Sequence, residues 1–417
     1  MPENFHIDMP EAVRNIIHTI EEHGFKAYAV GGCIRDSILG RNPDDWDITT
    51  SAVPSQIKTF FKRTVDTGIA HGTVTIMIDK TGYEVTTYRI DGEYEDGRHP
   101  KSVEFSDRLV DDLCRRDFTI NAMAYNDTDG FVDEFKGLDD LDTKIIRCVG
   151  EPELRFTEDA LRMMRAIRFS AQLGFTIDEA TWNAIKKLSP SISKISMERV
   201  HVELGKTLMS AHPDYVAQYS EAGLFAPILP VIDNALKSRY KRKILATLQH
   251  TPDNIYLRYA ALFITSTPDE AAKTLRALKL DNKTVNTVSK LVELSKMDIE
   301  ETEPAVRTAL NKYGRDFLPL WHELMMAVIQ ASEDITGISN PAKVKHLLTL
   351  KRLGTDILAR GDCFTIKDLD ISGNDLIEYG LQGHEIGKTL KSLLDIVIEN
   401  PKLNDKATLI AMIEHIK

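Results

Sequence analysis

The chain has 417 residues, 42% of them hydrophobic and 28% charged, which is enough for roughly two to four compact units with buried cores. Its net charge of −11 argues against a protein that coats nucleic acid nonspecifically, and no stretch reaches the roughly 20 apolar residues that a membrane helix needs. The four cysteines lie at no metal-ligand spacing and are too few for a disulfide framework. Because the first residues also lack a signal-peptide pattern, we expect a cytoplasmic protein without a membrane segment.

The first 150 residues predict a small α/β unit, because short β-rich runs alternate with helical patterns and are broken by Gly and Asp. The polar segment Asp91–Asp107 is poor in strand-forming residues and is predicted to be a mobile loop. Helices are predicted over Pro10–His23, Ile34–Leu39, Pro54–Phe61 and Leu138–Asp142. Strands are predicted over Ala27–Val30, Trp46–Thr49, Thr73–Ile78 and Tyr83–Arg89, with a turn at Lys80-Thr81-Gly82, and Phe118–Tyr125 and Phe131–Phe135 close the sheet region.

The sequence after residue 150 is helical almost to its end. Glu158–Leu173 has a strong helical pattern, and Gly174 ends it. Further helices are separated by short breaks such as Leu229-Pro230, and a last helical block begins near Ala342. The predicted plan is a small α/β head followed by a long helical body.

Two glycines, Gly31 and Gly32, lie between a predicted strand and a predicted helix. Glycines let the backbone approach a phosphate closely, and the start of a helix offers free N–H groups. Arg35 lies one turn further on and can donate two hydrogen bonds to a pair of phosphate oxygens. Considered alone, two glycines before a helix are more often only a tight turn.

The next predicted strand carries two carboxylates. Because residues i and i+2 of a strand share a face, Asp45 and Asp47 point the same way while Trp46 faces the other side. Adjacent carboxylates repel each other, and Mg²⁺ ions would both resolve that repulsion and assist phosphoryl transfer. Asp45 and Asp47 are therefore predicted to bind metal and to be catalytic. Glu84, on an alternating strand, is a candidate third catalytic carboxylate, the alternative being an ordinary exposed strand glutamate.

Two arginines, Arg115 and Arg116, precede an apolar segment and suit the charge of a triphosphate. Arg116 is the first candidate for this contact. The alternative is a salt bridge with one of the nearby aspartates, Asp111, Asp112 or Asp117.

These motifs follow one another at the spacing of a known family. They are Gly31-Gly32-x-x-Arg35-Asp36, Asp45-x-Asp47, Arg115-Arg116-Asp117-Phe118-Thr119-x-Asn121-Ala122, Arg155-Phe156-x-Glu158-Asp159-x-x-Arg162 and Glu198-Arg199-Val200. The chain resembles class II tRNA nucleotidyltransferases, the bacterial CCA-adding enzymes, and their relatives the bacterial poly(A) polymerases. The specific motifs cover roughly residues 26–205, whereas the tail is similar only through Gly383-x-x-Ile386-Gly387-x-x-Leu390.

The resemblance implies an α+β fold, with a small nucleotidyltransferase head on a mixed β-sheet followed by an all-α neck, body and tail. We expect the head at residues 1–150, the neck with a nucleotide-recognition helix at 151–205, the body at 206–335 and the tRNA-binding tail at 336–417. The family also suggests a homodimer and implies that Asp45 and Asp47 bind Mg²⁺. Contacts with the incoming CTP or ATP are implied for Gly32, Arg35, Arg116, Asp159, Arg162, Arg165 and Arg168.

The predicted neck helix offers a way to select a nucleotide. Asp159, Arg162, Arg165 and Arg168 are spaced by three, so adjacent members are neighbours on a helix surface. Cytosine and adenine both present an amino donor beside a ring-nitrogen acceptor, and uracil and guanine reverse that pattern. Asp159 can accept from the amine and Arg162 can donate to the ring nitrogen, without a nucleic-acid template. Arg165 and Arg168 are better placed to bind phosphate or to organise the site.

The sequence thus predicts sequential addition of C, C and A to the 3′ end of tRNA from CTP and ATP, with pyrophosphate leaving. A poly(A) polymerase is disfavoured by the acidic balance and by the lack of a longer basic C-terminal region. Enzymes that add only CC or only the final A stay open as alternatives, although the loop with Gly92, Glu93, Arg98 and Lys101 favours full CCA addition. A noncatalytic tRNA-binding protein is the alternative from another class, and the retained pair of aspartates argues against it.

Overall fold

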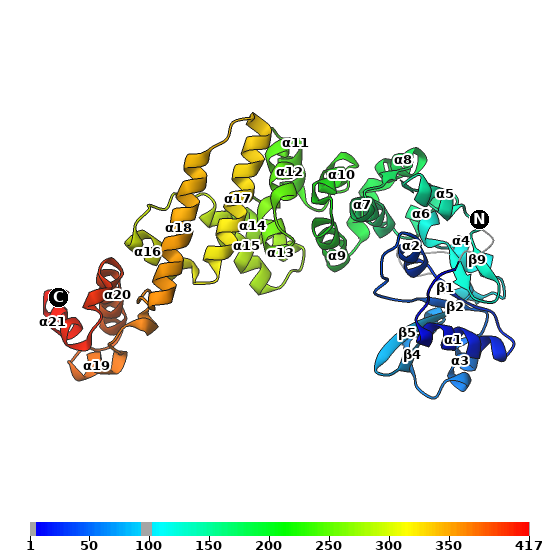
Figure 1. Ribbon diagram of the computed structural model, residues 1–417, viewed down its shortest axis with the longest axis horizontal. Helices are drawn as coiled ribbons and strands as arrows, with labels where there is room; N and C mark the ends of the chain where they lie inside the picture. Colours follow the sequence, from blue (N-terminus) through cyan, green and yellow to red (C-terminus); the bar gives the residue numbers. More distant parts are fainter. Residues whose placement is uncertain (1–5, 93–101, 417) are drawn as a thin grey trace. The chain divides into compact units, whose positions relative to one another are not determined.

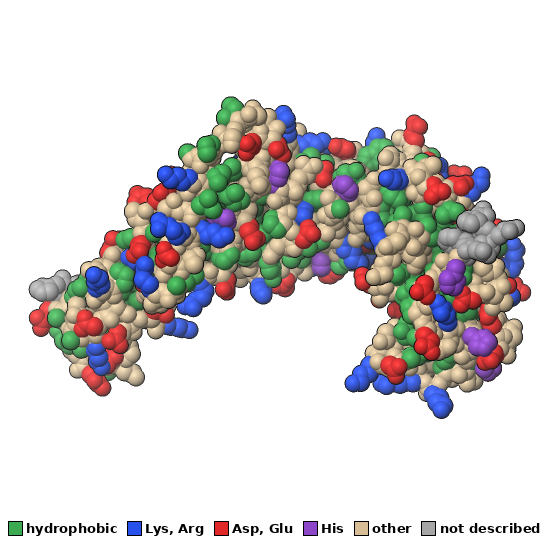
Figure 2. Space-filling view, viewed as in Figure 1, with side chains coloured by type: hydrophobic (Ala, Val, Ile, Leu, Met, Phe, Trp, Pro, Cys, Tyr) green, Lys and Arg blue, Asp and Glu red, His purple; other side chains and the backbone are tan. Residues whose placement is uncertain are grey.

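The computed structural model describes residues 6–92 and 102–416. The chain forms two compact units, one up to Pro230 and one from Val231 onward. In the described part of the chain, no helix is both long enough and apolar enough to cross a lipid bilayer. Asp and Glu outnumber Lys and Arg in the sequence, and on the face drawn in Figure 2 the two kinds of side chain are interspersed.

The first unit begins with a seven-stranded mixed sheet in the order β3-β4-β5-β2-β1-β8-β9. Only the β2–β5 pair is parallel among these neighbours, in the residues described. The strands are β1 (Ala27–Val30), β2 (Ile48–Thr50), β3 (Thr64–Gly68), β4 (Thr73–Ile78), β5 (Thr81–Thr87), β8 (Ala124–Asn126) and β9 (Gly130–Val132). Further helices lead away from this sheet (Figure 1), so the predicted α+β fold with a mixed sheet in the head is confirmed.

Helices surround the sheet and continue beyond it. Helix α1 packs against β1, β2 and α3 through an apolar face that includes Val13, Ile16 and Ile20. Apolar residues at every third or fourth position explain why this segment is an amphipathic helix. The helices of the first unit are α1 (Glu11–Glu22), α2 (Gly32–Ile38), α3 (Pro54–Phe60), α4 (Leu109–Cys114), α5 (Gly137–Asp142), α6 (Pro152–Glu158), α7 (Leu161–Leu173), α8 (Glu179–Leu188), α9 (Met197–Leu208) and α10 (Val216–Glu221).

Several details of the head differ from the prediction. The strand predicted at Trp46–Thr49 begins only at Ile48, and the turn predicted at residues 80–82 lies at Asp79-Lys80, whose φ angles are positive. Strand β3 was not predicted, and the segment Phe118–Tyr125 forms a strand only from Ala124. The described ends of the predicted loop 91–107 form the antiparallel pair β6 (Arg89–Asp91) and β7 (Val103–Phe105). Glu93, Arg98 and Lys101, named with that loop, lie outside the described residues.

The second unit is helical throughout its described residues. Its longest helices, α17 and α18, pack side by side, and α12 packs against α17. The helices are α11 (Pro230–Lys237), α12 (Lys241–His250), α13 (Ile255–Leu262), α14 (Pro268–Ala277), α15 (Asn282–Leu294), α16 (Glu303–Tyr313), α17 (Phe317–Thr336), α18 (Pro341–Arg360), α19 (Gly373–Glu378), α20 (His384–Glu399) and α21 (Lys406–Ile416). The last of these surround an apolar cluster of their own that includes Leu376, Leu393, Val397 and Leu409.

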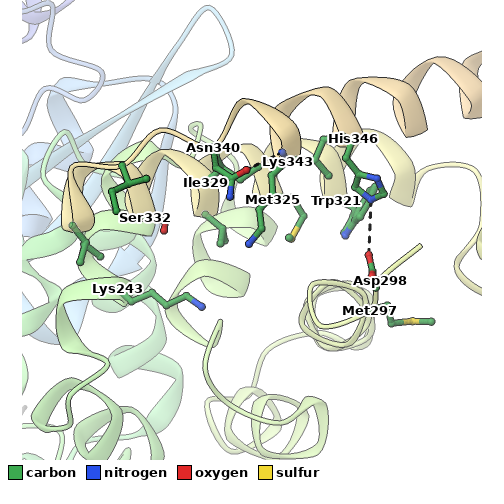
Figure 3. A pocket seen from close by; sticks show the side chains of 14 residues that line it. Lys243, Met297, Asp298, Trp321, Met325, Ile329, Ser332, Asn340, Lys343 and His346 are labelled. Atoms are coloured by element: carbon green, nitrogen blue, oxygen red, sulfur yellow. Dashed lines mark hydrogen bonds and ion pairs between the residues drawn. The ribbon is translucent and has the colours of Figure 1, made fainter. Parts of the chain in front are cut away.

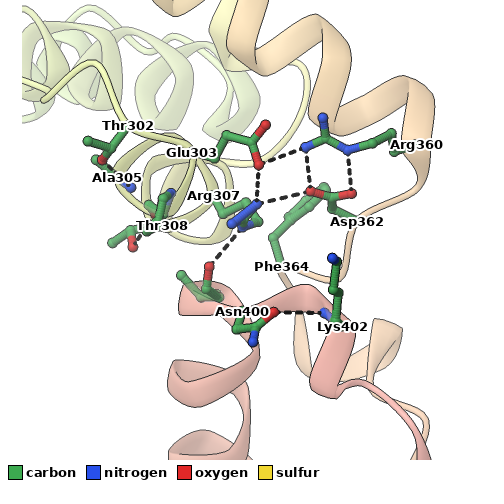
Figure 4. A network of polar contacts seen from close by, with 12 residues as sticks. Thr302, Glu303, Ala305, Arg307, Thr308, Arg360, Asp362, Phe364, Asn400 and Lys402 are labelled. Atoms are coloured by element: carbon green, nitrogen blue, oxygen red, sulfur yellow. Dashed lines mark hydrogen bonds and ion pairs between the residues drawn. The ribbon is translucent and has the colours of Figure 1, made fainter.

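A buried arginine joins α16 to the ends of α18 and α20 (Figure 4). Arg307 is 2% exposed. Its Nε donates to the carbonyl oxygen of Ile398 at 2.8 Å, and its Nη1 lies 3.0 Å from Asp362 and 3.1 Å from Glu303. Arg360 contacts the same two carboxylates at 2.9 Å. The guanidinium therefore supplies a buried donor to the carboxylate of Asp362 and to the carbonyl group of Ile398.

Replacing this arginine should destabilise the second unit. Arg307→Met keeps the volume of the side chain but leaves Asp362 and the Ile398 carbonyl without their buried donor, so we expect the free energy of unfolding to fall by about 3 kcal/mol. Urea denaturation followed by circular dichroism measures this change. The matched control is Arg352→Met, an exposed position on α18, which should change stability by less than about 0.5 kcal/mol. Equal effects of the two substitutions would contradict this role for Arg307.

Candidate active site

The turn between β1 and α2 requires glycine at Gly31. Its φ angle is +86°, in the region that favours glycine, and a Cβ atom there would lie 2.8 Å from Nη1 of Arg116. The guanidinium of Arg116 therefore lies directly against the start of α2. This close approach connects the predicted phosphate turn with the predicted triphosphate-binding arginine.

The two aspartates lie just before β2 rather than within it. The backbone N–H of Val30 donates to the carbonyl oxygen of Asp47 at 3.0 Å, so this residue is aligned with the sheet although the strand begins at Ile48. Trp46 is 9% exposed, whereas Asp45 and Asp47 are exposed, as the predicted alternation requires. Because β2 pairs with β5 in parallel, with Ile48 opposite Val85, the register extended by one residue places Asp47 beside Glu84.

The three carboxylates form a region of excess negative charge. Surrounding protein groups exclude solvent from one side of the Asp47 carboxyl and raise its pKa, and although the charge of Arg116 lowers it, Asp45 raises it again. Burial likewise raises the pKa of Glu84, and so do the charges of Asp47 and Asp45. The raised values come chiefly from loss of solvent around these carboxyls, which the charge of Arg116 does not offset at Asp47. A hard divalent cation with oxygen ligands fits the adjacent pair Asp45 and Asp47.

The carboxylate of Asp112 lies beneath this region and is fully buried. Burial alone would raise its pKa, but the charges of Arg115 and Arg116 outweigh burial and hold the pKa below its usual value. The distances from Asp112 are 2.6 Å to Arg115 and 3.3 Å to Arg116. Thr49 Oγ1 of β2 also donates to Asp112 at 3.1 Å. The salt bridge weighed as an alternative for Arg116 therefore exists, and it fixes the arginine against Gly31.

The neck helix is interrupted where a continuous helix was predicted. Helix α6 ends at Glu158 and α7 begins at Leu161, so Asp159 precedes α7 and does not share a helix with Arg162, Arg165 and Arg168. Asp159 has extended backbone angles, and its Oδ1 accepts the backbone N–H of Leu161 at 3.0 Å. An aspartate that bonds to the N–H two residues later favours a helix start, which explains the break.

Asp159 and Arg162, the proposed base-reading pair, are each held by their own partners. Arg199 of α9 contacts both oxygens of Asp159, at 2.6 and 3.3 Å. Arg162 contacts Glu158 at 2.5 Å, and its Nη2 donates to the carbonyl oxygen of Arg115 at 3.0 Å. Arg199, which belongs to the motif Glu198-Arg199-Val200, thus orients one of the predicted nucleotide-binding residues.

Arg165 and Arg168 form ion pairs with buried carboxylates. Arg165 contacts one oxygen of Asp117 through Nε at 2.7 Å and through Nη2 at 2.6 Å. Burial would raise the pKa of Asp117, but Arg165, Asn121 and Arg162 lower it to about 2. Arg168 Nε donates to Glu203 of α9 at 2.5 Å. These pairs fix α7 to the head on one side and to α9 on the other.

Three guanidinium groups lie against the aromatic ring of Phe169. The distances from the ring centroid are 3.8 Å to Arg168, 5.0 Å to Arg35 and 5.4 Å to Arg165. Cation–π attraction of this kind contributes about 0.5–2 kcal/mol per contact and partly offsets the repulsion between the arginines. Phe169 therefore holds arginines of two separate elements close together.

Arg35 of α2 is buried with other protein groups as partners. It pairs with both oxygens of Asp36, at 2.7 and 2.9 Å, and donates to Asn121 Oδ1 at 2.6 Å. Since a guanidinium has five N–H donors, donors remain for a ligand.

A cavity of about 560 Å³ opens in front of α2. Its size suits a small ligand. Burial raises the pKa of the Cys33 thiol in its wall to about 12, so the thiol is neutral. Of the predicted site residues, the cavity brings together Gly32, Arg35, Asp45, Asp47 and Arg168. In the described structure the others, Glu84, Arg116, Asp159, Arg162 and Arg165, are not in its lining.

Sequence reasoning missed several residues that build this site. Phe169 gave no signal, because a phenylalanine on a helix is ordinarily a core residue. The spacing of Asp112 from Arg115 and Arg116, three and four residues, did carry a signal, since such pairs meet on one helix face. The contacts of Asn121 and Glu203 depend on tertiary packing, and local sequence does not reveal them.

Comparisons with known proteins cover most of the chain. Residues 27–147 match a family model described as the poly A polymerase head domain, residues 174–236 one for an RNA- and SrmB-binding site of polymerase A, and residues 256–413 one for tRNA nucleotidyltransferase domain 2. The chain is 34% identical to a CCA-adding enzyme of Pediococcus pentosaceus over 98% of both chains. It is 36% identical to that of Levilactobacillus brevis, over 99% of this chain and 98% of the relative. The Bacillus stearothermophilus CCA-adding enzyme in complex with CTP superposes with a TM-score of 0.75 at 31% identity, over 97% of this chain and 96% of the other.

The negative charge of Asp45, Asp47 and Glu84 predicts that divalent cations stabilise the folded protein. We expect this stabilisation to depend on pH. Raised carboxyl pKa values mean that the folded protein binds more protons than the unfolded chain, so Asp47 and Glu84 make the ion-free protein less stable as pH rises through their titration range. A cation that binds only the folded form reverses this loss. At pH 7, millimolar MgCl₂ should increase the free energy of unfolding by roughly 1–3 kcal/mol, and near pH 4.5 by less, because protons compete.

Thermal denaturation with and without MgCl₂ at both pH values measures this response. The double substitution Asp45→Asn/Asp47→Asn should abolish it, whereas the neighbouring Asp44→Asn should keep it. A full response in the double variant would show that the ion binds elsewhere.

Proposed function

The chain belongs to the CCA-adding enzymes, a family of nucleotidyltransferases, and we propose that it adds C, C and A in sequence to the 3′ end of tRNA from CTP and ATP, without a template. The single observation that carries the proposal is the cavity in front of α2. Its lining includes Gly32, the Asp45/Asp47 pair and three arginines, Arg35, Arg41 and Arg168. Phosphate-binding cations and metal-binding carboxylates within one cavity are what transfer of a nucleotide from a triphosphate needs.

In this proposal the metal is Mg²⁺, and its ligands are Asp45 and Asp47. Among the described residues, no group of three or more His, Cys, Asp and Glu side chains could hold a metal ion by itself. A site of two carboxylates suits Mg²⁺, which commonly takes one or two carboxylates and completes its shell with water and substrate phosphates. When bound, the ion supplies positive charge for the attacking and leaving oxygens. Glu84 is assigned an accessory catalytic role through its charge beside Asp47.

The arginines bind and orient the triphosphate. Arg116 is fixed against Gly31 by Asp112, and Arg35 and Arg168 are fixed by Phe169, so their positions are set before the substrate arrives. Such preorganisation avoids an entropy cost when the α-phosphate is placed in line with the 3′-hydroxyl of tRNA. The 3′-oxygen then forms the new bond to the α-phosphorus, and pyrophosphate leaves.

Selection of C and A is assigned to Asp159 and Arg162. Arg199 holds Asp159, whose oxygens can only accept hydrogen bonds, as an amino group requires, whereas the guanidinium of Arg162 can only donate them, as a ring nitrogen requires. Uracil or guanine would leave buried polar groups without partners, at a cost of about 1–3 kcal/mol for each group. Arg165, in its ion pair with Asp117, contributes by holding α7 in place and by its charge.

We further propose the division into head (1–150), neck (151–205), body (206–335) and tail (336–417), with body and tail binding tRNA. The proposed enzyme acts in the cytoplasm and forms a homodimer. The family resemblance and the helical tail support the dimer, and sedimentation equilibrium would test it.

Incorporation of labelled nucleotides tests the proposed function. The substrate is a tRNA transcript that lacks its last three nucleotides, offered each NTP alone and then CTP with ATP. We expect CTP alone to extend the transcript by two residues, and CTP with ATP by three. A ladder of many A residues would select a poly(A) polymerase, and a stop after CC or a requirement for a CC end would select a partial enzyme.

The same assay tests the metal-binding pair. Asp47→Ala should lower incorporation by roughly 10³-fold or more, while binding of the tRNA transcript in a filter assay stays within about twofold. Asp66→Ala, an exposed carboxylate of β3, is the matched control and should keep incorporation near the wild-type rate. Wild-type incorporation by Asp47→Ala would contradict the site assignment.

A further inference from the structure

The second unit contains a cavity that the proposed reaction does not use. Its volume is about 590 Å³, within the range of ligand-binding pockets, and it lies among α12, α17, α18 and residues 297–298 after α15 (Figure 3). One wall is an apolar stripe along α17 formed by Trp321, Met325 and Ile329. Ile338, which also lines it, is 71% exposed. Methionine-rich apolar walls adapt to flat or irregular ligands.

A buried donor in this apolar wall lacks an acceptor. Trp321 is 2% exposed, and its indole Nε1 has no hydrogen-bond partner in the described structure. Leaving a buried N–H group unpaired is unfavourable, and most such groups in proteins have partners. The side chain lines the cavity, so a bound molecule with an acceptor atom can supply the missing hydrogen bond.

The opening of the cavity is positively charged. Lys243 of α12 and Lys343 of α18 line it, and Figure 3 shows both extending into the same space. Neither lysine has an ion pair among the described contacts, unlike Lys237 and Lys312, which pair with carboxylates at 2.8 and 2.7 Å. The acidic residue in the lining is Asp298, which lies 4.0 Å from His346. Two unpaired ammonium groups favour an anion at this opening.

We propose that this cavity binds one unstacked nucleotide, with its base against the α17 stripe and its phosphate at Lys243 and Lys343. A nucleobase is flat and apolar on its faces, and it carries acceptor atoms that can accept the Trp321 N–H. A fatty acid would match the apolar wall and the lysines but would leave the indole N–H unpaired. Unstacked bases are commonly bound on aromatic and apolar side chains in this way. The nucleotide comes either from the RNA substrate or from the free pool, and tRNA as its source rests on the proposed function.

Photocrosslinking of the full-length protein tests the site and its two sources. One probe is 8-azido-AMP, and the other is a tRNA transcript lacking its last three nucleotides, with 4-thiouridine in place of uridine. Mass spectrometry should find label on peptides from residues 321–332 or 341–347. Label from 8-azido-AMP supports a free nucleotide, label from the transcript supports an RNA nucleotide, and label from both supports a site open to either.

Matched surface variants decide whether the cavity is responsible. The double substitution Lys243→Ala/Lys343→Ala should reduce label at these peptides by roughly tenfold, because each charge-assisted phosphate contact is lost. Arg242→Ala/Lys345→Ala removes two exposed cations from the same helices without touching the cavity lining, and should leave the label unchanged. All four positions are exposed, so the fold should be unaffected, and circular dichroism checks this.

Equal label in the two double variants, or no label in either peptide, would overturn the proposal, as would protection by sodium stearate but not by AMP. Nucleotide incorporation is measured on the same wild-type preparation, so that the two proposals are tested separately. Incorporation without crosslinking rejects the nucleotide site in this cavity alone, whereas crosslinking without incorporation rejects the proposed function alone.

Discussion

The ion pair between the buried Asp117 and the half-buried Arg165 is the interaction on which the site depends. It joins the segment after α4 to helix α7, and the carboxylate of Asp117 would be costly to bury without this cation. The pKa of about 2 for Asp117 shows that the carboxylate is ionised and held by its neighbours. With α7 fixed in this way, the ring of Phe169 on that helix lies against Arg35 of α2. Arginines of α2 and α7 therefore lie close together around this ring.

Charge compensation is uneven across this unit, and the unevenness supports the proposed division between phosphate-binding and metal-binding residues. Around α7, each arginine that faces the interior has a carboxylate partner, as Arg165 has Asp117 and Arg168 has Glu203. At the edge of the sheet, Asp45 and Asp47 form no ion pair among the described contacts, and the charge of Arg116 does not offset the loss of solvent that raises the pKa of Asp47. A cation is therefore needed beside Asp45 and Asp47 and not around α7. The rigid, paired arginines can therefore orient an anionic substrate next to carboxylates that need a metal.

Sequence patterns predicted the parts of this account that depend on local periodicity. The alternation of Asp45, Trp46 and Asp47 survives, because burial of a tryptophan fixes which face the carboxylates occupy, even though the strand begins later. Strand β3 was missed because most of it is exposed and polar, so it has no apolar alternation to detect. The break before α7 was missed because the apolar spacing continues through it, while the contacts of Asp159 with Arg199 come from a distant helix. Arginine clustering on Phe169 likewise exists only after folding.

The central claim is that protein side chains fixed by this network, and no nucleic acid, choose the nucleotide. Asp159 can only accept hydrogen bonds, whereas asparagine at the same position can also donate one to the O4 acceptor of uracil. The most direct measurement is the ratio of kcat/KM for CTP to that for UTP with Asp159→Asn, on a tRNA transcript that lacks its last three nucleotides. If protein side chains select the nucleotide, this ratio falls by about tenfold or more relative to the unchanged protein. An unchanged ratio would contradict selection of the nucleotide by Asp159.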